Sequence, residues 1–220
     1  ADHPPAIPVA VVHPVDDVSL TGAVAAAHQG LIIPLLVGPA AKIRAAADAA
    51  QLDISEFELI DVPHSHAAAE RAVALVREGR AEALMKGALH TDELMHEVLK
   101  RDSGLRTERC ISHVMAFDVP TYPRPLFITD AAINISPSLD QKRDIICNAI
   151  ELAHALGNQD PRVAILSAVE TVNPRIPSTL DAAALCKMAD RGQICGGTLD
   201  GPLAFDNAIS ESAARTKGID

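Results

Sequence analysis

The chain has 220 residues, of which 48% are hydrophobic and 22% are charged, a balance that is typical of a globular protein and excludes general disorder. It has 19 Lys and Arg residues and 29 Asp and Glu residues, which gives a net charge of −10. Only 2% of its residues are aromatic. Such a chain lacks the phosphate attraction and the stacking groups of a nucleic-acid-binding protein. We therefore expect no nucleic-acid partner.

The sequence indicates neither a targeting signal nor a membrane segment. The first apolar stretch, Ile7–Val12, follows no basic region and is too short for a signal peptide. No apolar run approaches the ~18 residues of a membrane span. The four cysteines, at positions 110, 147, 186 and 195, form no C-x-x-C motif, and scattered thiols favour a reducing compartment. We expect a cytoplasmic protein without membrane contact.

The first half of the chain alternates short apolar runs with Ala-rich segments. Its predicted strands span residues 7–12, 32–37, 57–62 and 83–86. Its predicted helices span residues 17–29, 40–51, 65–79 and 91–100, with Ser65 and Thr91 as N-caps of the last two. Pro34 lacks an amide hydrogen, so it places the second strand at an edge or a bend.

These strands are apolar throughout, which indicates a sheet covered on both faces. Repeated β–α units of this size indicate parallel strands with right-handed crossovers. The pattern predicts an α/β fold with two doubly wound domains. The charged, turn-forming segment RDSGLRTER, around residues 101–109, places the boundary between domains 1–108 and 109–220.

The second half of the chain continues with less regular elements. Its predicted strands span residues 111–118, 125–130, 162–167 and 194–199, the first two joined by a Pro-rich turn. Its predicted helices span residues 140–156, 178–190 and 207–215. Ligands of open parallel sheets bind beyond the carboxyl ends of the strands, so candidate site residues are sought there.

The turn after the fourth strand carries the clearest binding signal. Lys86 ends that strand, Gly87 follows it, and Thr91 begins the next helix. A lysine beside free N–H groups at a helix N-terminus predicts an anion site. The alternative is an exposed lysine next to an ordinary helix cap. Neither G-x-x-x-x-G-K-S/T nor G-x-G-x-x-G occurs in the chain, which weakens a nucleotide-binding interpretation.

Polar residues follow other predicted strands as well. His13 and Pro14 follow the first strand. Ser167 stands at the end of the strand at 162–167 and lacks the G-x-S-x-G motif of a nucleophile, so it is a candidate hydrogen-bond donor to substrate. The remaining candidates fit a structural turn as well as a binding role, and they are Asp130, Asn134, Asp200 and Gly201. His64 and His66 have the spacing of a metal pair but are more typical of exposed residues beside a helix cap.

Five segments together resemble the phosphate acetyltransferase/phosphate butyryltransferase family. They are MKGALHTDELMHEVL (85–99), RCISHVMAFDVP (109–120), LFITDAAINISPSLDQK (126–142), VAILSAVETVNPRIPST (163–179) and GGTLDGPLAFDNAIS (196–210). The resemblance implies a fold like that of isocitrate and isopropylmalate dehydrogenases, with two α/β domains around a cleft. It also implies reversible transfer of an acetyl or butyryl group between coenzyme A and inorganic phosphate.

The resemblance further implies the partners and the site. The partners would be coenzyme A, acyl phosphate and phosphate, with coenzyme A as a substrate and no other cofactor or metal. From the apolar segments 145–156 and 194–199 we expect a homodimer built through the region after residue 108. The family includes forms fused behind a MaoC-type hydratase domain. Ser167 and His90 are the expected catalytic residues. The expected substrate-binding residues are Lys86, Gly87, Thr91, Arg109, Ser112, Asp130, Asn134, Asp200 and Gly201.

Two departures from the family pattern qualify these expectations. The family's Ser-Arg pair belongs to a C-terminal segment that would follow Asp220, and His96 stands where the family usually has an arginine. We therefore expect these 220 residues alone to turn over acyl phosphate slowly. One alternative is a non-catalytic domain that binds acyl-CoA or phosphate. The other is a metal-dependent decarboxylating dehydrogenase, which would need clustered acidic ligands.

Overall fold

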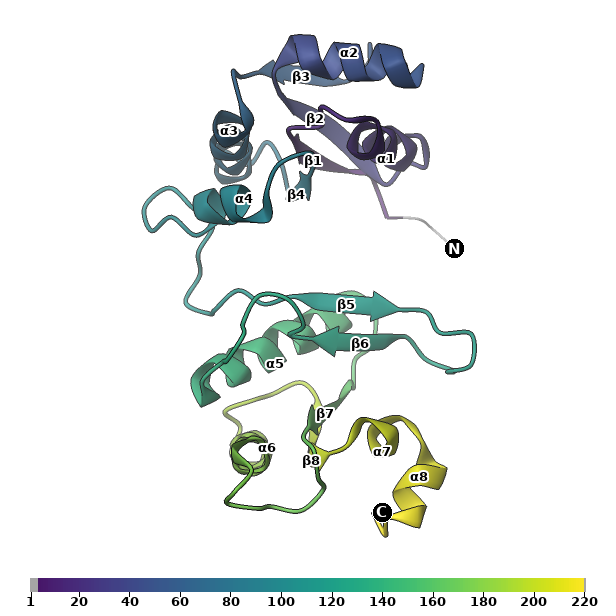
Figure 1. Cartoon of the computed structure of the whole chain (residues 1–220), viewed down its shortest axis with the longest axis vertical. Coiled ribbons are helices and arrows are strands. Elements are labelled where there is room, and N and C mark those ends of the chain that lie inside the picture. The colour runs from purple at the N-terminus through teal and green to yellow at the C-terminus, as the bar shows by residue number, and fades with distance from the viewer. Residues whose placement is uncertain (1–3, 220) are drawn as a thin grey trace. The chain divides into compact units, whose positions relative to one another are not determined.

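The computed structural model describes residues 4–219, and the chain divides into two compact units, Ala1–Thr107 and Glu108–Asp220 (Figure 1). The first unit contains a parallel sheet of four strands in the order β3-β2-β1-β4. Its strands are β1 (Ile7–Val12), β2 (Ile32–Gly38), β3 (Glu58–Asp61) and β4 (Ala83–Lys86). Its helices are α1 (Asp17–His28), α2 (Ala40–Ala50), α3 (Ser65–Arg77) and α4 (Thr91–Val98). The predicted α/β fold with a parallel sheet is confirmed.

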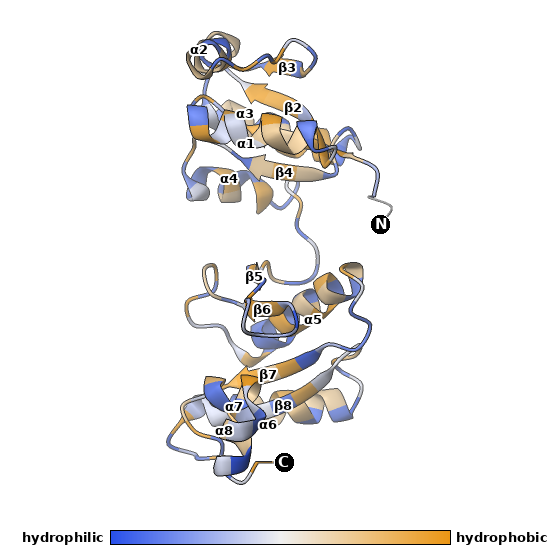
Figure 2. Ribbon diagram, turned by 90° about the vertical axis from the view of Figure 1, so that its right-hand side faces the viewer, coloured by the Kyte–Doolittle hydropathy of each residue, from blue (hydrophilic) through white to orange (hydrophobic). Residues whose placement is uncertain are grey.

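Helices α1 and α2 cover one face of this sheet. Successive strand side chains point to opposite faces, so one face receives Val11 and Leu36, both fully buried. They pack in one cluster with Leu20 of α1 and Ile43 of α2, which are fully buried as well. In Figure 2 the strands of this sheet are largely orange, the colour of hydrophobic residues, as expected for strands that are covered on both faces.

The opposite face is packed against α3 and α4 through small side chains. Ala10 and Val12 of β1 lie in one cluster with Ala68, Ala69 and Ala72 of α3, and all five are 0% exposed. Alanine brings a helix backbone close to a sheet. This packing builds a core without aromatic residues, as the composition requires.

Strand β2 occupies an inner position, so of the two alternatives predicted from Pro34, an edge or a bend, the edge is wrong. It pairs with β1 from Ile32 to Val37, but its pairing with β3 begins only at Leu35. Pro34 therefore lies in the part of β2 that has a single paired neighbour. A proline is tolerated there because no second ladder requires its missing amide hydrogen.

The N-caps of α3 and α4 are His64 and His90 rather than the predicted Ser65 and Thr91. An N-cap residue keeps an extended backbone while the next residue begins the helix. His64 has φ −159° and ψ 176°, and its Nδ1 accepts a hydrogen bond of 3.2 Å from the amide of Ala67. His90 has φ −70° and ψ 148°.

The second unit contains two separate two-stranded sheets among its described residues. Strands β5 (Val114–Phe117) and β6 (Leu126–Thr129) are antiparallel, whereas β7 (Arg162–Leu166) and β8 (Thr198–Leu203) are parallel. Its helices are α5 (Leu139–Ala155), α6 (Pro177–Asp190), α7 (Phe205–Ile209) and α8 (Glu211–Thr216). This unit therefore lacks the single parallel sheet that a doubly wound domain requires, because its first two strands form a hairpin.

Two predicted elements of this unit are shifted. Strand β8 begins at Thr198 instead of residue 194, because Gly196 has φ 87°, a left-handed conformation that interrupts a strand. The predicted helix 207–215 is divided at Ser210, whose extended backbone ends α7 and whose side chain accepts from the amide of Ala213 to begin α8.

None of the helices within residues 4–219 combines the length and the apolar character that a membrane crossing requires. The arrangement of two domains around a cleft stays a prediction.

Candidate functional site

A cavity of about 560 Å³ lies in the first unit, at the carboxyl ends of β1 and β4. Parallel strands present their carboxyl ends at one edge of the sheet, so residues distant in the sequence meet there. Three of the predicted site residues contribute to the cavity, namely Lys86, Gly87 and His90. Thr91 follows as the first residue of α4 and does not line it. The lining is completed by His13, Asp16, Ser65, Ala88, Leu89 and Glu93.

Gly87 is required by the close approach of its backbone to the end of β1. A Cβ atom at this position would lie 2.5 Å from the carbonyl oxygen of Val12 and 2.8 Å from that of His13. The Gly87 amide donates to the Val12 carbonyl at 2.9 Å, and the Ala88 amide donates to the His13 carbonyl at 2.9 Å. The turn after Lys86 is thus attached to the neighbouring strand by its backbone.

Lys86 supplies a cation at this edge. Its side chain is exposed, and its Nζ lies 3.5 Å from the carbonyl oxygen of Gly87. No carboxylate of residues 4–219 forms an ion pair with it. The pKa of Asp16 is lowered by hydrogen bonds from the Ser19 side chain and amide, with smaller contributions from Lys86 and His13.

The N-terminus of α4 is already partly capped by its own carboxylate. The His90 amide donates to Glu93 Oε2 at 3.3 Å, and the hydroxyl of Ser65 donates to Glu93 Oε1 at 3.3 Å. His66 Nε2 lies 3.1 Å from the same Oε1. A carboxylate here uses the positive end of the helix. The cationic character of the cavity therefore comes from Lys86 more than from the helix.

In the second unit, Ser112 belongs to a different cluster. Asn148 of α5 donates through Nδ2 to Ser112 Oγ at 2.9 Å and to the carbonyl of Cys110 at 3.0 Å. Arg109 Nη2 forms an ion pair of 2.6 Å with Glu151 Oε1, and the two side chains are 40% and 63% exposed. The segment before β5 is thereby fixed to α5.

Asp130 and Asn134 hold the loop after β6 together. Asp130 accepts hydrogen bonds from the amides of His113, Ile133 and Asn134 at 3.3, 3.1 and 3.0 Å. Desolvation acts to raise its pKa, but the hydrogen bonds from Asn134 and from backbone amides lower it overall. Asn134 Nδ2 donates to the Asp130 carboxylate and, at 2.9 Å, to the carbonyl of Ile111. The hydrogen bonds of Asp130 and Asn134 are thus made within this loop and with the segment before β5.

Ser167, Asp200 and Gly201 lie at the parallel pair β7–β8. Ser167 Oγ lies 2.7 Å from Ser178 Oγ, and its amide donates to the Leu203 carbonyl at 2.8 Å. Asp200 and Gly201 were predicted beyond a strand end, which is wrong because both lie within β8. Gly201 belongs there because a Cβ would lie 2.7 Å from the carbonyl oxygen of Ile165.

Three polar residues of the cavity, Asp16, Ser65 and Glu93, were not predicted as site residues. A signal existed for Glu93, because an acidic residue three positions after an N-cap is typical of a capping box. His13 was noted at a strand end, but its backbone conformation has no sequence signal. No group of three or more His, Cys, Asp or Glu residues suited to a metal ion occurs within residues 4–219.

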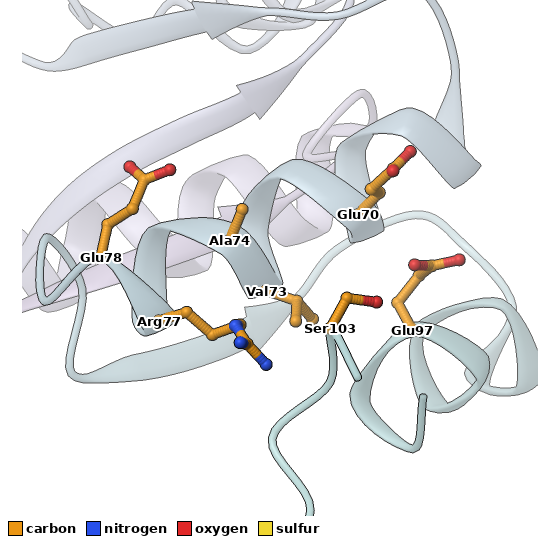
Figure 3. Close-up of a pocket in the computed structure, with 7 residues that line it drawn as sticks. All are labelled: Glu70, Val73, Ala74, Arg77, Glu78, Glu97 and Ser103. Atoms are coloured by element: carbon orange, nitrogen blue, oxygen red, sulfur yellow. The ribbon is translucent and has the colours of Figure 1, made fainter. Parts of the chain in front are cut away.

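A second cavity, of about 390 Å³, lies between α3 and the region of α4. Its lining is Glu70, Val73, Ala74, Arg77, Glu78, Glu97 and Ser103 (Figure 3). Two of its charged groups have structural partners, since Arg77 donates to the Gly104 carbonyl at 3.0 Å and Glu97 pairs with Lys100 at 2.6 Å. None of the predicted site residues lines this cavity.

Comparison with known proteins gives a consistent result. The sequence pattern of the phosphate acetyl/butaryl transferase family matches residues 63–220. A phosphate acetyltransferase of Rhizobium meliloti is 65% identical over 98% of this chain and 68% of its own length. One from Rickettsia felis is 56% identical over 97% of this chain, which spans 61% of that relative. A phosphate butyryltransferase of Clostridium acetobutylicum is 45% identical over 88% of this chain and 64% of its own length.

Solved structures agree with the fold. A branched-chain phosphotransacylase from Enterococcus faecalis superposes with a TM-score of 0.80 at 28% identity, covering 96% of this chain and 73% of that one. The EutD phosphotransacetylase of Staphylococcus aureus superposes with a TM-score of 0.73 at 18% identity, covering 97% and 73%. The latter likeness concerns the fold alone.

Proposed function

This chain belongs to the phosphate acetyl/butaryl transferase family, and from this membership we propose that it transfers an acetyl or butyryl group between coenzyme A and inorganic phosphate. Family membership is the observation that carries the reaction, since the relatives named for both acyl groups align over most of the chain. The chain spans 68% of the Rhizobium meliloti relative and 61% of the Rickettsia felis relative. The activity is therefore proposed for the protein to which these residues belong.

We propose that phosphate, free or as part of the acyl phosphate, binds in the cavity at Lys86. An ammonium group with no carboxylate paired to it within residues 4–219 is a suitable partner for a phosphate anion. Gly87 and Ala88 keep the turn close to β1, so the lysine extends from a fixed backbone. His90 lines the same cavity and stays a candidate contact.

In the direction of thioester formation, the thiol sulfur of coenzyme A attacks the acyl carbon of the acyl phosphate. The bond from that carbon to the bridging oxygen breaks, and phosphate leaves with the electron pair. The reaction needs the thiol proton removed, the phosphate charge neutralised and the oxygen of the tetrahedral intermediate stabilised. Lys86 is proposed to neutralise the phosphate charge.

The hydrogen bonds of the predicted site residues of the second unit separate proposed substrate contacts from proposed structural residues. Ser167 shares a hydrogen bond with Ser178, and such a hydroxyl pair keeps a donor for a substrate oxygen, so we retain it as a proposed contact. Ser112 and Arg109 also stay proposed substrate contacts. Asp130 and Asn134 are proposed as structural residues instead, because their hydrogen bonds close the loop after β6.

The test of the phosphate site is Lys86→Ala. We expect its phosphate affinity, measured by calorimetry, to fall by about 1–3 kcal/mol, the contribution of a hydrogen bond to a charged group. Lys42→Ala, which removes another lysine of the first unit outside the cavity, is the control and leaves the affinity unchanged. Equal phosphate affinity in the wild type and Lys86→Ala would remove Lys86 from the site.

We also propose a homodimer formed through the second unit, on revised grounds. The apolar runs at 145–156 and 194–199 pack partly inside that unit, where Ile146, Ile150 and Ile194 are 5%, 2% and 2% exposed. Several apolar side chains of that unit are nevertheless exposed, among them Met115 at 44%, Ile135 at 102% and Leu156 at 62%. Sedimentation at micromolar concentration tests this, and a monomer would contradict it. The hydratase fusion and the cytoplasmic location stay predictions.

A further inference from the structure

We propose that Asp16 is a specificity-determining residue of the phosphate site, whose carboxylate accepts a hydrogen bond from the P–OH group of inorganic phosphate and disfavours sulfate. The inference rests on the phosphate site proposed above at Lys86 and identifies what selects the anion there. Asp16 lies in the connection between β1 and α1, directly before the helix, and it lines the same cavity as Lys86.

The helix cap uses only one oxygen of the Asp16 carboxylate. Asp16 Oδ1 accepts hydrogen bonds from the Ser19 amide at 2.8 Å and from the Ser19 hydroxyl at 2.5 Å. Asp16 Oδ2 has no hydrogen-bond partner within residues 4–219. A carboxylate has about four lone-pair sites, and Asp16 is an exposed residue. The cap therefore leaves acceptor capacity that a ligand from solution can use.

This carboxylate stays ionised at neutral pH. The pKa of Asp16 lies below its ordinary value of 3.8, because the hydrogen bonds from the Ser19 side chain and amide lower it more than burial raises it. Lys86 and His13, which also line the cavity, make smaller contributions in the same direction. An ionised carboxylate accepts hydrogen bonds and donates none. Asp16 therefore distinguishes anions that carry a proton from anions that do not.

Lys86 and Asp16 lie close enough to act on one anion. The Lys86 ammonium contributes to the lowered pKa of Asp16, yet no ion pair joins the two side chains. They are thus near each other without direct contact, in a cavity of about 560 Å³. A tetrahedral anion that receives a hydrogen bond from the ammonium can direct a second oxygen to the carboxylate.

The other carboxylate of the cavity is already paired. Glu93 Oε1 accepts from the Ser65 hydroxyl at 3.3 Å and lies 3.1 Å from His66 Nε2. Glu93 Oε2 accepts from the His90 amide at 3.3 Å. Of the two carboxylates that line the cavity, only that of Asp16 keeps an oxygen without a partner from residues 4–219.

The chemistry of the two anions explains the selection. At mildly alkaline pH phosphate is mainly HPO₄²⁻, which has the shape and the charge of sulfate but carries one proton. Phosphate donates this proton in a hydrogen bond to Asp16 and keeps it. Sulfate presents only acceptor oxygens, so one of them would face the carboxylate without a hydrogen bond and be repelled by its charge.

The matched variant is Asp16→Asn in the full-length protein, since asparagine caps a helix as well as aspartate does. The amide oxygen keeps the bonds from Ser19, so the NH₂ group takes the place of the free oxygen and donates to either anion. By calorimetry we expect the wild type to bind phosphate about 10–100 times more tightly than sulfate, as a hydrogen bond to a charged group implies. In Asp16→Asn this ratio should fall to within about threefold of one, mainly because sulfate binds more tightly.

Asp17→Asn is the control, because it removes the same charge one residue away and outside the cavity. Both anions should gain slightly and equally from the lost charge, so the ratio of their affinities should stay as in the wild type. An equal fall of this ratio in both variants would make the selection a long-range charge effect and would overturn the role of Asp16.

Arsenate provides a test on the wild type alone, which decides if Asp16→Asn fails to fold. Arsenate is larger than phosphate but also keeps a proton at this pH, so it should bind like phosphate. Arsenate rejected together with sulfate would overturn the proposal. A wild type that forms thioester but binds sulfate as tightly as phosphate would overturn the role of Asp16 alone. A wild type that forms no thioester and binds neither phosphate nor sulfate would overturn the proposed function, and the role of Asp16 with it.

Discussion

Replacing Gly87 with alanine tests whether the turn after β4 depends on a backbone contact that excludes a side chain. The new Cβ would lie 2.5 Å from the carbonyl oxygen of Val12 and 2.8 Å and 2.9 Å from the carbonyl oxygen and carbon of His13. All three contacts are with backbone atoms, so no flexible side chain can move aside. The strand end or the turn must shift.

We expect Gly87→Ala to lower the free energy of unfolding by about 1–3 kcal/mol, the usual cost of overpacking. Since 1 kcal/mol corresponds to about 4–8 °C in a domain of this size, the melting temperature of the first unit should fall by roughly 4–24 °C. Calorimetry of the unfolding transition measures this. Phosphate affinity should fall too, because the shifted turn carries Lys86.

Gly22→Ala is the matched control within the same unit. Its Cβ would lie 3.6 Å from the Met85 side chain, an ordinary contact, and Gly22 lies inside α1. Alanine is favoured over glycine by about 1 kcal/mol in a helix, so this variant should be stabilised. A Gly87→Ala protein that melts within about 1 °C of the wild type would refute the reasoning about the turn.

Two further predictions concern the second unit. Asp130→Ala removes the acceptor of the His113, Ile133 and Asn134 amides and should lower the free energy of unfolding by about 1–3 kcal/mol without changing phosphate affinity. Unaltered denaturant unfolding would contradict the structural role. Hydrogen bonds from Lys217 and Asn207 lower the pKa of Glu170 from 4.5 to about 2. A depressed carboxyl pKa stabilises the fold above 4.5 and loses this effect as the pH falls toward 2, so Glu170→Gln should be less acid-sensitive than the wild type in melting experiments across that range. Equal sensitivity of the two proteins would refute the coupling.

The first unit is well predicted by its sequence because its signals are local. The apolar runs around Val11 and Leu36, separated by Ala-rich helices, specify a covered parallel sheet without knowledge of distant contacts. The place of β2 in the strand order cannot be predicted from its local sequence. Pro34 weakens one ladder only, and whether a second ladder is needed there depends on where β3 begins to pair.

In the candidate site, too, some residues can be predicted from the local sequence and others cannot. Lys86 and Gly87 follow a strand in the sequence, so the strand-end rule finds them. His13 contributes through a φ of 58° and a bond to Ala88, which is 75 positions away, and neither is visible in a linear pattern. Asp200 illustrates the opposite error. The left-handed Gly196 delays the start of β8 to Thr198 and the strand runs to Leu203, so a residue predicted beyond the strand end lies within it.

The alanine-based packing of α3 has a consequence for conformational entropy. A buried alanine gives up no rotamer freedom on folding, whereas a buried methionine or leucine gives up about 0.5–2 kcal/mol. Ala68, Ala69 and Ala72 are 0% exposed, so these three positions of α3 pack on the sheet at almost no side-chain entropy cost. Each alanine also contributes little buried area. The stability of this layer is therefore spread over many small contacts, and enlargement of any one of the three side chains should harm it more than truncation.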